Sequence, residues 1–170
     1  MNIQEIYQQV ESDPSLLSTI NIDELLENIE SETTEYLEGQ TLKTITNTIR
    51  QVLLNSGIIE NLSSIYDKLI GYRHVERICE IRLGVYVRWI SINTEKDPTK
   101  KNNIYLKPGG TVISIKICEE GVQVVCKTAF GRHVSFRFDE CILFQKLTVE
   151  EQLILMAYDY IQNSDSAETI

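Results

Sequence analysis

The sequence predicts an α+β fold, in which a small helical bundle over residues 1–71 precedes an antiparallel β-barrel with a capping C-terminal helix over residues 72–162. A disordered tail is expected over residues 163–170. Two observations support this fold. Hydrophobic residues recur with a helical period before Gly71 and with a strand-like period after it. The charge changes at the same place, because residues 1–71 hold three Lys or Arg against twelve Asp or Glu, whereas residues 72–147 hold thirteen against eight.

Before Gly71 the signals are those of short helices with short connections. Apolar residues at positions i, i+3, i+4 and i+7 predict a first helix from Asn2 to Val10. Asp13-Pro14 and Asp23 are typical helix starts, and glycines at positions 39, 57 and 71 are typical helix ends. We expect the helices to pack as a small antiparallel bundle. The further helices are predicted over residues 13–20, 23–37, 41–55 and 58–70.

The predicted helix over residues 23–37 is rich in glutamate. Its acidic residues include Glu24, Glu27, Glu30, Glu32 and Glu35. This run fits a solvated helix face, and it equally fits a docking face for a basic partner, including the middle region of a second copy of the chain.

After Gly71, short runs of β-branched and aromatic residues alternate with turn residues, which is typical of strands. Their regular spacing favours a small antiparallel barrel or a strongly bent sheet. The predicted strands cover residues 75–83, 85–92, 104–107, 111–118, 122–128, 132–138 and 141–147.

The clearest unit of this region is a hairpin that turns at Glu120-Gly121. We expect Ile117 to lie opposite Val124 and Ile115 opposite Cys126, which places six apolar residues on one face. These are Ile113, Ile115, Ile117, Val122, Val124 and Cys126. A second hairpin is predicted to turn at residues 129–131 and to carry a basic polar face.

The pair Thr148 and Glu151 has the spacing of a capping box and predicts the start of the last helix. This apolar helix is expected to close one end of the barrel or to pack on the N-terminal helices. No apolar run approaches the roughly 18 residues that cross a bilayer, and the N-terminus does not resemble a signal peptide. The sequence therefore predicts a cytoplasmic protein without a membrane partner.

No motif in the sequence predicts catalysis, a metal or another cofactor. The cysteines Cys79, Cys118, Cys126 and Cys141 are separated by 38, 7 and 14 residues, whereas paired zinc ligands lie roughly two to four residues apart. No nucleophile elbow occurs, and Gly109-Gly110 does not open a helix as a phosphate loop would. We expect reduced, metal-free thiols and no enzymatic activity.

The cationic middle region predicts a binding surface, and two functions are open. A protein-interaction or structural component would dock an acidic protein through it. A single-stranded nucleic-acid-binding protein would add base stacking by Tyr86, Trp89, Tyr105 or Phe130. The acidic flanks favour the first function, and self-association is open as well. The candidate residues are Arg88, Trp89, Lys100, Lys101, Lys107, Lys116, Arg132 and Arg137.

Three segments of the second half carry a resemblance: Leu83 to Ile90, Lys107 to Gly110, and Phe138 to Leu147 with the helix that follows. Together they resemble small proteins encoded by large nucleocytoplasmic DNA viruses, which implies a viral source and a place in the host cytoplasm or the virion. The strand lengths are also similar to those of SH3-like or Tudor-type barrels. A shared architecture does not fix a function.

Overall fold

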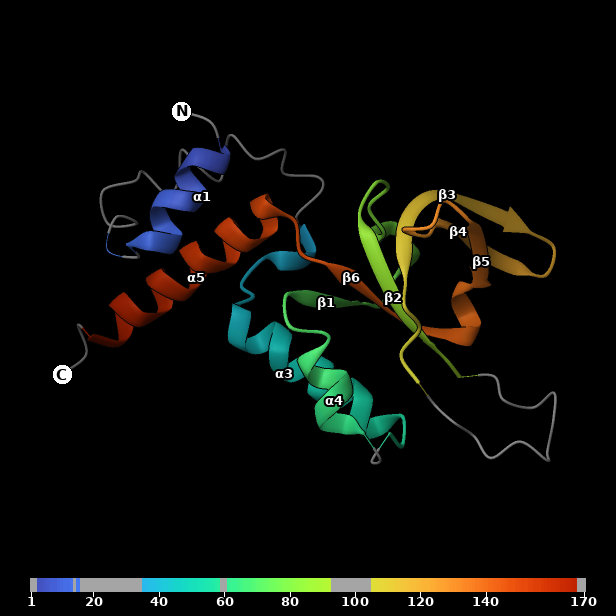
Figure 1. Cartoon of the computed structure of the whole chain (residues 1–170). Helices are drawn as coiled ribbons and strands as arrows, with labels where there is room; N and C mark the ends of the chain where they lie inside the picture. The colour runs from blue at the N-terminus through green and yellow to red at the C-terminus, as the bar shows by residue number, and fades with distance from the viewer. Residues whose placement is uncertain (1–2, 14, 16–34, 59–60, 93–104, 168–170) are drawn as a thin grey trace. The chain divides into compact units, whose positions relative to one another are not determined.

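The computed structural model describes residues 3–13, 15, 35–58, 61–92 and 105–167, and it has an α+β fold with a six-stranded antiparallel sheet (Figure 1). The chain forms two compact units, one from residues 1–45 and 147–170 and the other from residues 46–146. The division therefore falls at these positions, whereas the change of sequence pattern falls at Gly71.

The first unit combines both ends of the chain. It contains α1 (Ile3–Ser12), the 3-10 helix η3 (Glu35–Leu37), the first turn of α3 (Leu42–Asn55) and α5 (Val149–Ala167). In this unit Tyr7 donates a hydrogen bond from its hydroxyl to Oε1 of Gln152 at 2.7 Å. Its buried core consists of Val10, Leu37, Ile45, Leu147, Leu153, Ile154 and Leu155.

The helices of this unit agree in part with those that the sequence predicts. The predicted first helix and the capping box are confirmed, since the Thr148 N–H donates to Glu151 Oε2 at 2.6 Å and the Glu151 N–H donates to Thr148 Oγ1 at 3.2 Å. Helix α5 continues to Ala167, past the start of the predicted tail, and neither Gly nor Pro interrupts it. The predicted helices over residues 13–20 and 23–37 lie largely outside the described residues, so the bundle stays a prediction.

The second unit contains the sheet, whose strand order is β1-β6-β2-β3-β4-β5. The strands are β1 (Tyr72–Val75), β2 (Tyr86–Ser91), β3 (Gly110–Cys118), β4 (Gly121–Lys127), β5 (His133–Arg137) and β6 (Cys141–Lys146). The 3-10 helices η4 (Ile78–Glu80) and η5 (Phe138–Glu140) follow β1 and β5.

The predicted barrel is wrong, because β1 and β5 are the outer strands of an open sheet. One reason lies after β1, where a strand over residues 75–83 was expected. The Glu80 carboxylate accepts hydrogen bonds from the N–H groups of Glu76 at 3.1 Å and Arg77 at 3.4 Å, and these bonds turn the chain into η4. The residues of the predicted strand over 104–107 that are described form no strand either, since Pro108 and Gly109, with φ of 99°, follow directly.

The sheet has an apolar core on each face, because successive side chains of a strand point to opposite sides. On β2, for example, Trp89 belongs to one core and Ile90 to the other. The first core contains Val75, Ile81, Val87, Trp89, Val112, Val124, Cys126, Phe136 and Leu143. The second joins the sheet to α3 and α4 (Leu62–Asp67) through Ile49, Leu53, Ile58, Ile65, Leu69, Ile90, Ile142 and Phe144. Helix α3 agrees with the prediction, whereas α4 is shorter than the expected helix over residues 58–70.

The β3–β4 hairpin forms, but its predicted register is wrong by two residues. Ile115 lies opposite Val124 and Ile117 opposite Val122, because the two turn residues are Glu119 and Glu120, and Gly121 pairs with Cys118. A β-bulge between Val112 and Ser114 then moves Val112 into the core and leaves Ile113 44% exposed.

Candidate binding surface on the sheet

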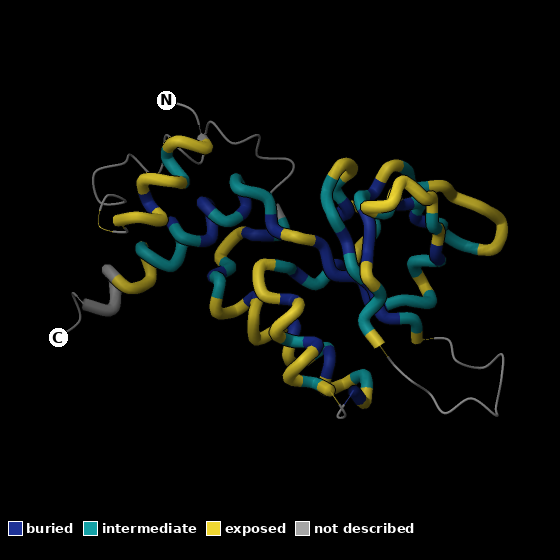
Figure 2. The backbone as a smooth tube through the Cα atoms, viewed as in Figure 1, coloured by how far each residue is buried: buried dark blue, intermediate teal, exposed yellow. Residues whose placement is uncertain are grey.

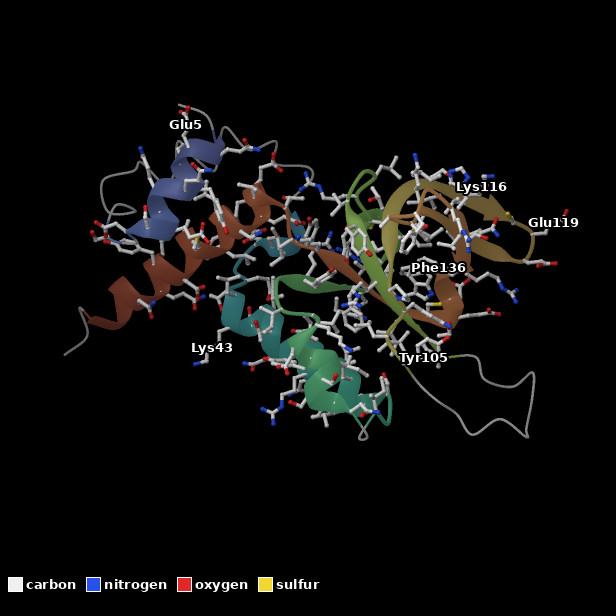
Figure 3. The ribbon with its side chains drawn as sticks, viewed as in Figure 1. Glu5, Lys43, Tyr105, Lys116, Glu119 and Phe136 are labelled. Atoms are coloured by element: carbon white, nitrogen blue, oxygen red, sulfur yellow. The ribbon has the colours of Figure 1, made fainter. Side chains whose placement is uncertain are left out.

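The outer side of β3, β4 and β5 is polar, and the inner side of the same strands is apolar. Val124, Cys126 and Phe136 point into the core, so the residues between them point outward. Figure 3 shows this contrast, with Lys116 and Glu119 at the surface of the hairpin and Phe136 among the strands. We call this outer side the polar face. It consists of Thr111, Ser114, Lys116, Gln123, Val125, Lys127, His133, Ser135 and Arg137.

The strand register arranges the polar face in rows. Lys116, Gln123 and Arg137 lie side by side in one row, and Thr111, Lys127 and His133 in another. The two rows are four residues apart along β4, which is about 13 Å at the usual rise of a strand. The Gln123 amide also donates to the Ser135 hydroxyl at 3.1 Å, which links β4 to β5 between the rows.

The cations of this region differ in whether an acidic group neutralises them. Arg137 lies 2.5 Å from an oxygen of Glu140 and 4.0 Å from one of Glu120, so its charge is compensated. Lys116, Lys127 and Arg132 are exposed, and none of them has an ion-pair partner within the part of the chain that the structure describes. These three side chains are the cations that a partner can reach.

The turn that joins β4 to β5 holds an aromatic side chain in solvent, because Phe130 is 91% exposed. Four hydrogen bonds close this turn. The Thr128 N–H donates to the Arg132 carbonyl at 2.8 Å, the Gly131 N–H donates to the Thr128 carbonyl at 2.9 Å, and the Thr128 hydroxyl bonds to the carbonyl and the N–H of Arg132 at 3.1 and 3.2 Å. Gly131 has φ of 75°, a conformation that glycine adopts without strain. Phe130 therefore projects from a fixed support.

The structure places the remaining predicted site residues elsewhere. Trp89 is buried and stacks on Phe136 with ring centroids 4.2 Å apart, so its ring faces the core. Arg88 donates to the carbonyls of Lys107 at 3.3 Å and Lys68 at 3.2 Å. The Lys107 ammonium lies 4.1 Å from the centre of the Tyr105 ring. Lys100 and Lys101 lie outside the described residues.

Lys116, Arg132 and Arg137 are thus the predicted residues that the sheet brings to one region. Lys127, another basic residue of the strands, lies in the second row, and Phe130 lies in the turn at the end of the polar face. Val124 and Cys126 are the buried members of β4, so Lys127 lies on its outer side.

All four cysteines are free thiols, and burial raises the pKa of Cys126 to about 11. Cys79 and Cys118 are exposed and Cys141 is half-buried. Among the described residues, no three His, Cys, Asp or Glu side chains gather in a way that could hold a metal ion.

No helix in the described part of the chain is both long enough and apolar enough to span a bilayer. Comparisons with protein-family models, with curated proteins and with solved structures found no match to this chain.

Proposed function

We propose that this protein is a non-enzymatic interaction component that binds an acidic segment of a protein partner with the end of its polar face. The contact surface consists of Phe130, Lys127 and Arg132 at this end, with Lys116 in the row about 13 Å further along the polar face. The acidic helical region is proposed as a second docking element, and the viral, cytoplasmic origin is proposed on the resemblance described above.

The observation that carries this proposal is the 91% exposure of Phe130 on a turn closed by four hydrogen bonds. Trp, Tyr and Arg side chains dominate the binding energy of protein interfaces, and Phe is also enriched in them. The fixed backbone of this turn reduces the conformational entropy that is lost when Phe130 binds. The cations beside Phe130 favour an acidic partner and exclude a basic one.

Single-stranded nucleic acid is the alternative, and the geometry gives it less support. Proteins of that class stack successive bases on several aromatic rings along a cationic groove. Here Trp89 is buried and the charge of Arg137 is compensated by Glu140 and Glu120. Tyr105 is 55% exposed, but it lies outside the polar face and the Lys107 ammonium lies 4.1 Å from its ring centre. Among the described residues of the polar face and its turn, Phe130 is therefore the stacking position beside the reachable cations.

An architectural proposal accompanies the functional one. Strands β2 to β5 follow each other in the sheet, η5 follows β5, and β6 returns to pair with β2. This order supports an open relative of the SH3-like barrels, with β1 as an additional strand on β6. The architecture does not decide the partner.

The test compares two charge-reversal variants of the full chain. The first carries Lys116→Glu, Lys127→Glu and Arg132→Glu, and the second carries the same change at Lys43, Arg50 and Lys68, which are also exposed. Each variant is used to capture proteins from nuclease-treated cell extract, and the captured proteins are quantified by mass spectrometry. The first variant and Phe130→Ala should lose the same partner proteins. The second variant should keep them.

Binding to a single-stranded oligonucleotide is measured on the same proteins. We expect a dissociation constant weaker than about 10⁻⁴ M at physiological salt, the weak end of non-specific binding. Low micromolar binding that falls with salt and disappears in the first variant would replace this proposal by the nucleic-acid alternative. Equal partner loss from both variants would contradict the proposed surface.

A further inference from the structure

Beyond the polar face, the outer half of β3 has an unpaired edge. Strand β2 pairs with β3 only at Gly110 and Thr111, and Val112 exchanges hydrogen bonds with Gly84 and Val85. From Ile113 to Cys118, no described residue bonds to the β3 backbone on the side away from β4. Alternate N–H and C=O groups of this segment therefore face solvent.

In this segment Ile113, Lys116, Ile117 and Cys118 are exposed, and Ser114 and Ile115 are half-buried. Ile117 is 89% exposed and Ile113 is 44% exposed, and Figure 2 shows the far end of the hairpin as a continuous exposed stretch. Natural proteins protect free strand edges with charged residues, prolines or β-bulges. The bulge after Val112 lies at the start of this segment, and Lys116 is its only charged residue. From Ser114 onward the edge has no further bulge and no proline, so it remains a template for another strand.

We propose that the β3 edge pairs with the β3 edge of a second copy of this chain, as antiparallel strands about a two-fold axis at Ile115. This register aligns residues 113–117 of one copy with residues 117–113 of the other. It sets each Ile113 beside Ile117 of its partner and each Lys116 opposite Ser114. Both exposed isoleucines are thereby covered by a like residue.

The charge pattern selects this register. A two-fold axis at Lys116 would set the two ammonium groups directly opposite each other, which destabilises a strand pair. Val112 limits the other end, because its backbone N–H and C=O already bond to residues 84 and 85. The sequence Ile-Ser-Ile-Lys-Ile over residues 113–117 is apolar at every second position, so either direction of reading presents the same surface. Such self-complementarity is what a two-fold interface requires.

The strand pair is short, so the dimer should be weak. Specific interfaces generally bury more than roughly 1,000 Å². A pair of five-residue strand edges lies at the low end of this range of buried area. We therefore expect a dissociation constant in the micromolar range.

Self-association is measured on the full chain by sedimentation velocity from about 1 to about 100 μM. The dimer fraction should rise with concentration, and Ile117→Lys should weaken dimerisation at least about tenfold. Ile70→Lys is the matched control, because Ile70 is 71% exposed and lies outside the sheet. A chain that stays monomeric throughout this range, or equal weakening by both variants, overturns the proposal.

A cross-linking experiment tests the register independently of stability. In a chain that also carries Cys79→Ser and Cys118→Ser, the pair Ser114→Cys and Lys116→Cys should give an interchain disulfide on oxidation. Neither Ser114→Cys nor Lys116→Cys should form this disulfide alone, because residue 114 of one copy faces residue 116 of the other. Efficient cross-linking through Lys116→Cys alone would move the two-fold axis to residue 116 and overturn the arrangement at Ile115.

Discussion

Thr148 and Glu151 exchange hydrogen bonds at the start of α5, and Glu151 is fully buried while it does so. The same carboxylate also accepts a hydrogen bond from the hydroxyl of Tyr36. Glu151 therefore satisfies one of the unpaired N–H groups at the helix start and ties η3 to α5 within the first unit.

Replacing Glu151 by alanine should destabilise the protein by about 1–3 kcal/mol, because the Thr148 N–H and the Tyr36 hydroxyl would lose a buried acceptor. Tyr36→Phe removes one of these bonds and should cost less. Urea unfolding followed by circular dichroism measures both changes. The control is Glu119→Ala, since Glu119 is exposed at the hairpin turn, and its effect should be near zero. An equal effect of Glu151→Ala and Glu119→Ala would contradict the bridging role.

The stability of the protein should fall below neutral pH because of His74. Burial lowers the pKa of His74 below its ordinary value of 6.5, against the opposing charges of Glu76 and Glu80. Between the lowered pKa and 6.5 the unfolded chain binds a proton that the folded chain does not, so the free energy of unfolding decreases as the pH falls below about 6.5. His74→Gln should remove this part of the pH dependence.

The control for this pH measurement is His133→Gln, because His133 is the second histidine of the chain and is exposed. Urea unfolding at pH 7.5, 6.5 and 5.5 compares the three proteins. A His74→Gln variant whose stability falls with pH as steeply as that of the unchanged protein would contradict the assignment.

The four thiols should react at different rates in the folded protein. Cys79 and Cys118 are exposed and should react first with a thiol reagent, whereas Cys126 is fully buried with a pKa of about 11 and should react only on unfolding. Cys126→Ala should leave the fast phase unchanged, and Cys118→Ser should halve it. A fast phase that includes Cys126, or about one equivalent of zinc by elemental analysis, would contradict the expectation of unligated thiols.

A chain of residues 46–146 should keep its β structure, and a chain of residues 72–162 should not. In the second unit Leu53, Ile65 and Leu69 cover Ile90 and Phe144, and a chain that starts at residue 72 leaves these sheet residues in water. Circular dichroism and thermal unfolding of the two chains give the comparison. Cooperative unfolding of residues 72–162 at a similar temperature would instead support the boundary at Gly71 that the sequence pattern predicts.

Local signals predicted those elements whose determinants lie close together in the sequence. The helix start at Thr148 and Glu151 and the turn at residues 129–131 depend on neighbours within a few positions, and both agree with the structure. The predicted β3–β4 register was wrong near the turn, because Gly121 pairs with Cys118 and does not occupy the turn. Further along the hairpin, the bulge after Val112 inserts a residue that alternation alone cannot reveal. The predicted barrel was wrong for a related reason, since its closure depends on strand pairs that are distant in sequence.

The contacts of the candidate site residues also depend on parts of the chain that local sequence patterns do not reveal. Alternation placed Arg137 on the outer side of β5, but the acidic groups that compensate it come from the adjacent η5 and from Glu120 in the β3–β4 turn. Trp89 sits in a strand with large residues on both faces, so the sequence could not show that its ring meets Phe136. Burial of an aromatic side chain is decided by packing and not by its neighbours in the chain.

The first unit is discontinuous, and this affects the order in which a ribosome can complete the two units. Val10, Leu37 and Ile45 are synthesised early, yet their core partners Leu153, Ile154 and Leu155 are made only after the whole of residues 46–146. Domains generally fold as units during synthesis. The sheet unit can therefore fold while the chain is still growing, whereas the apolar face of α1 waits for α5 to leave the exit tunnel. A premature stop before residue 149 would leave that face exposed, and quality-control chaperones should retain such a product.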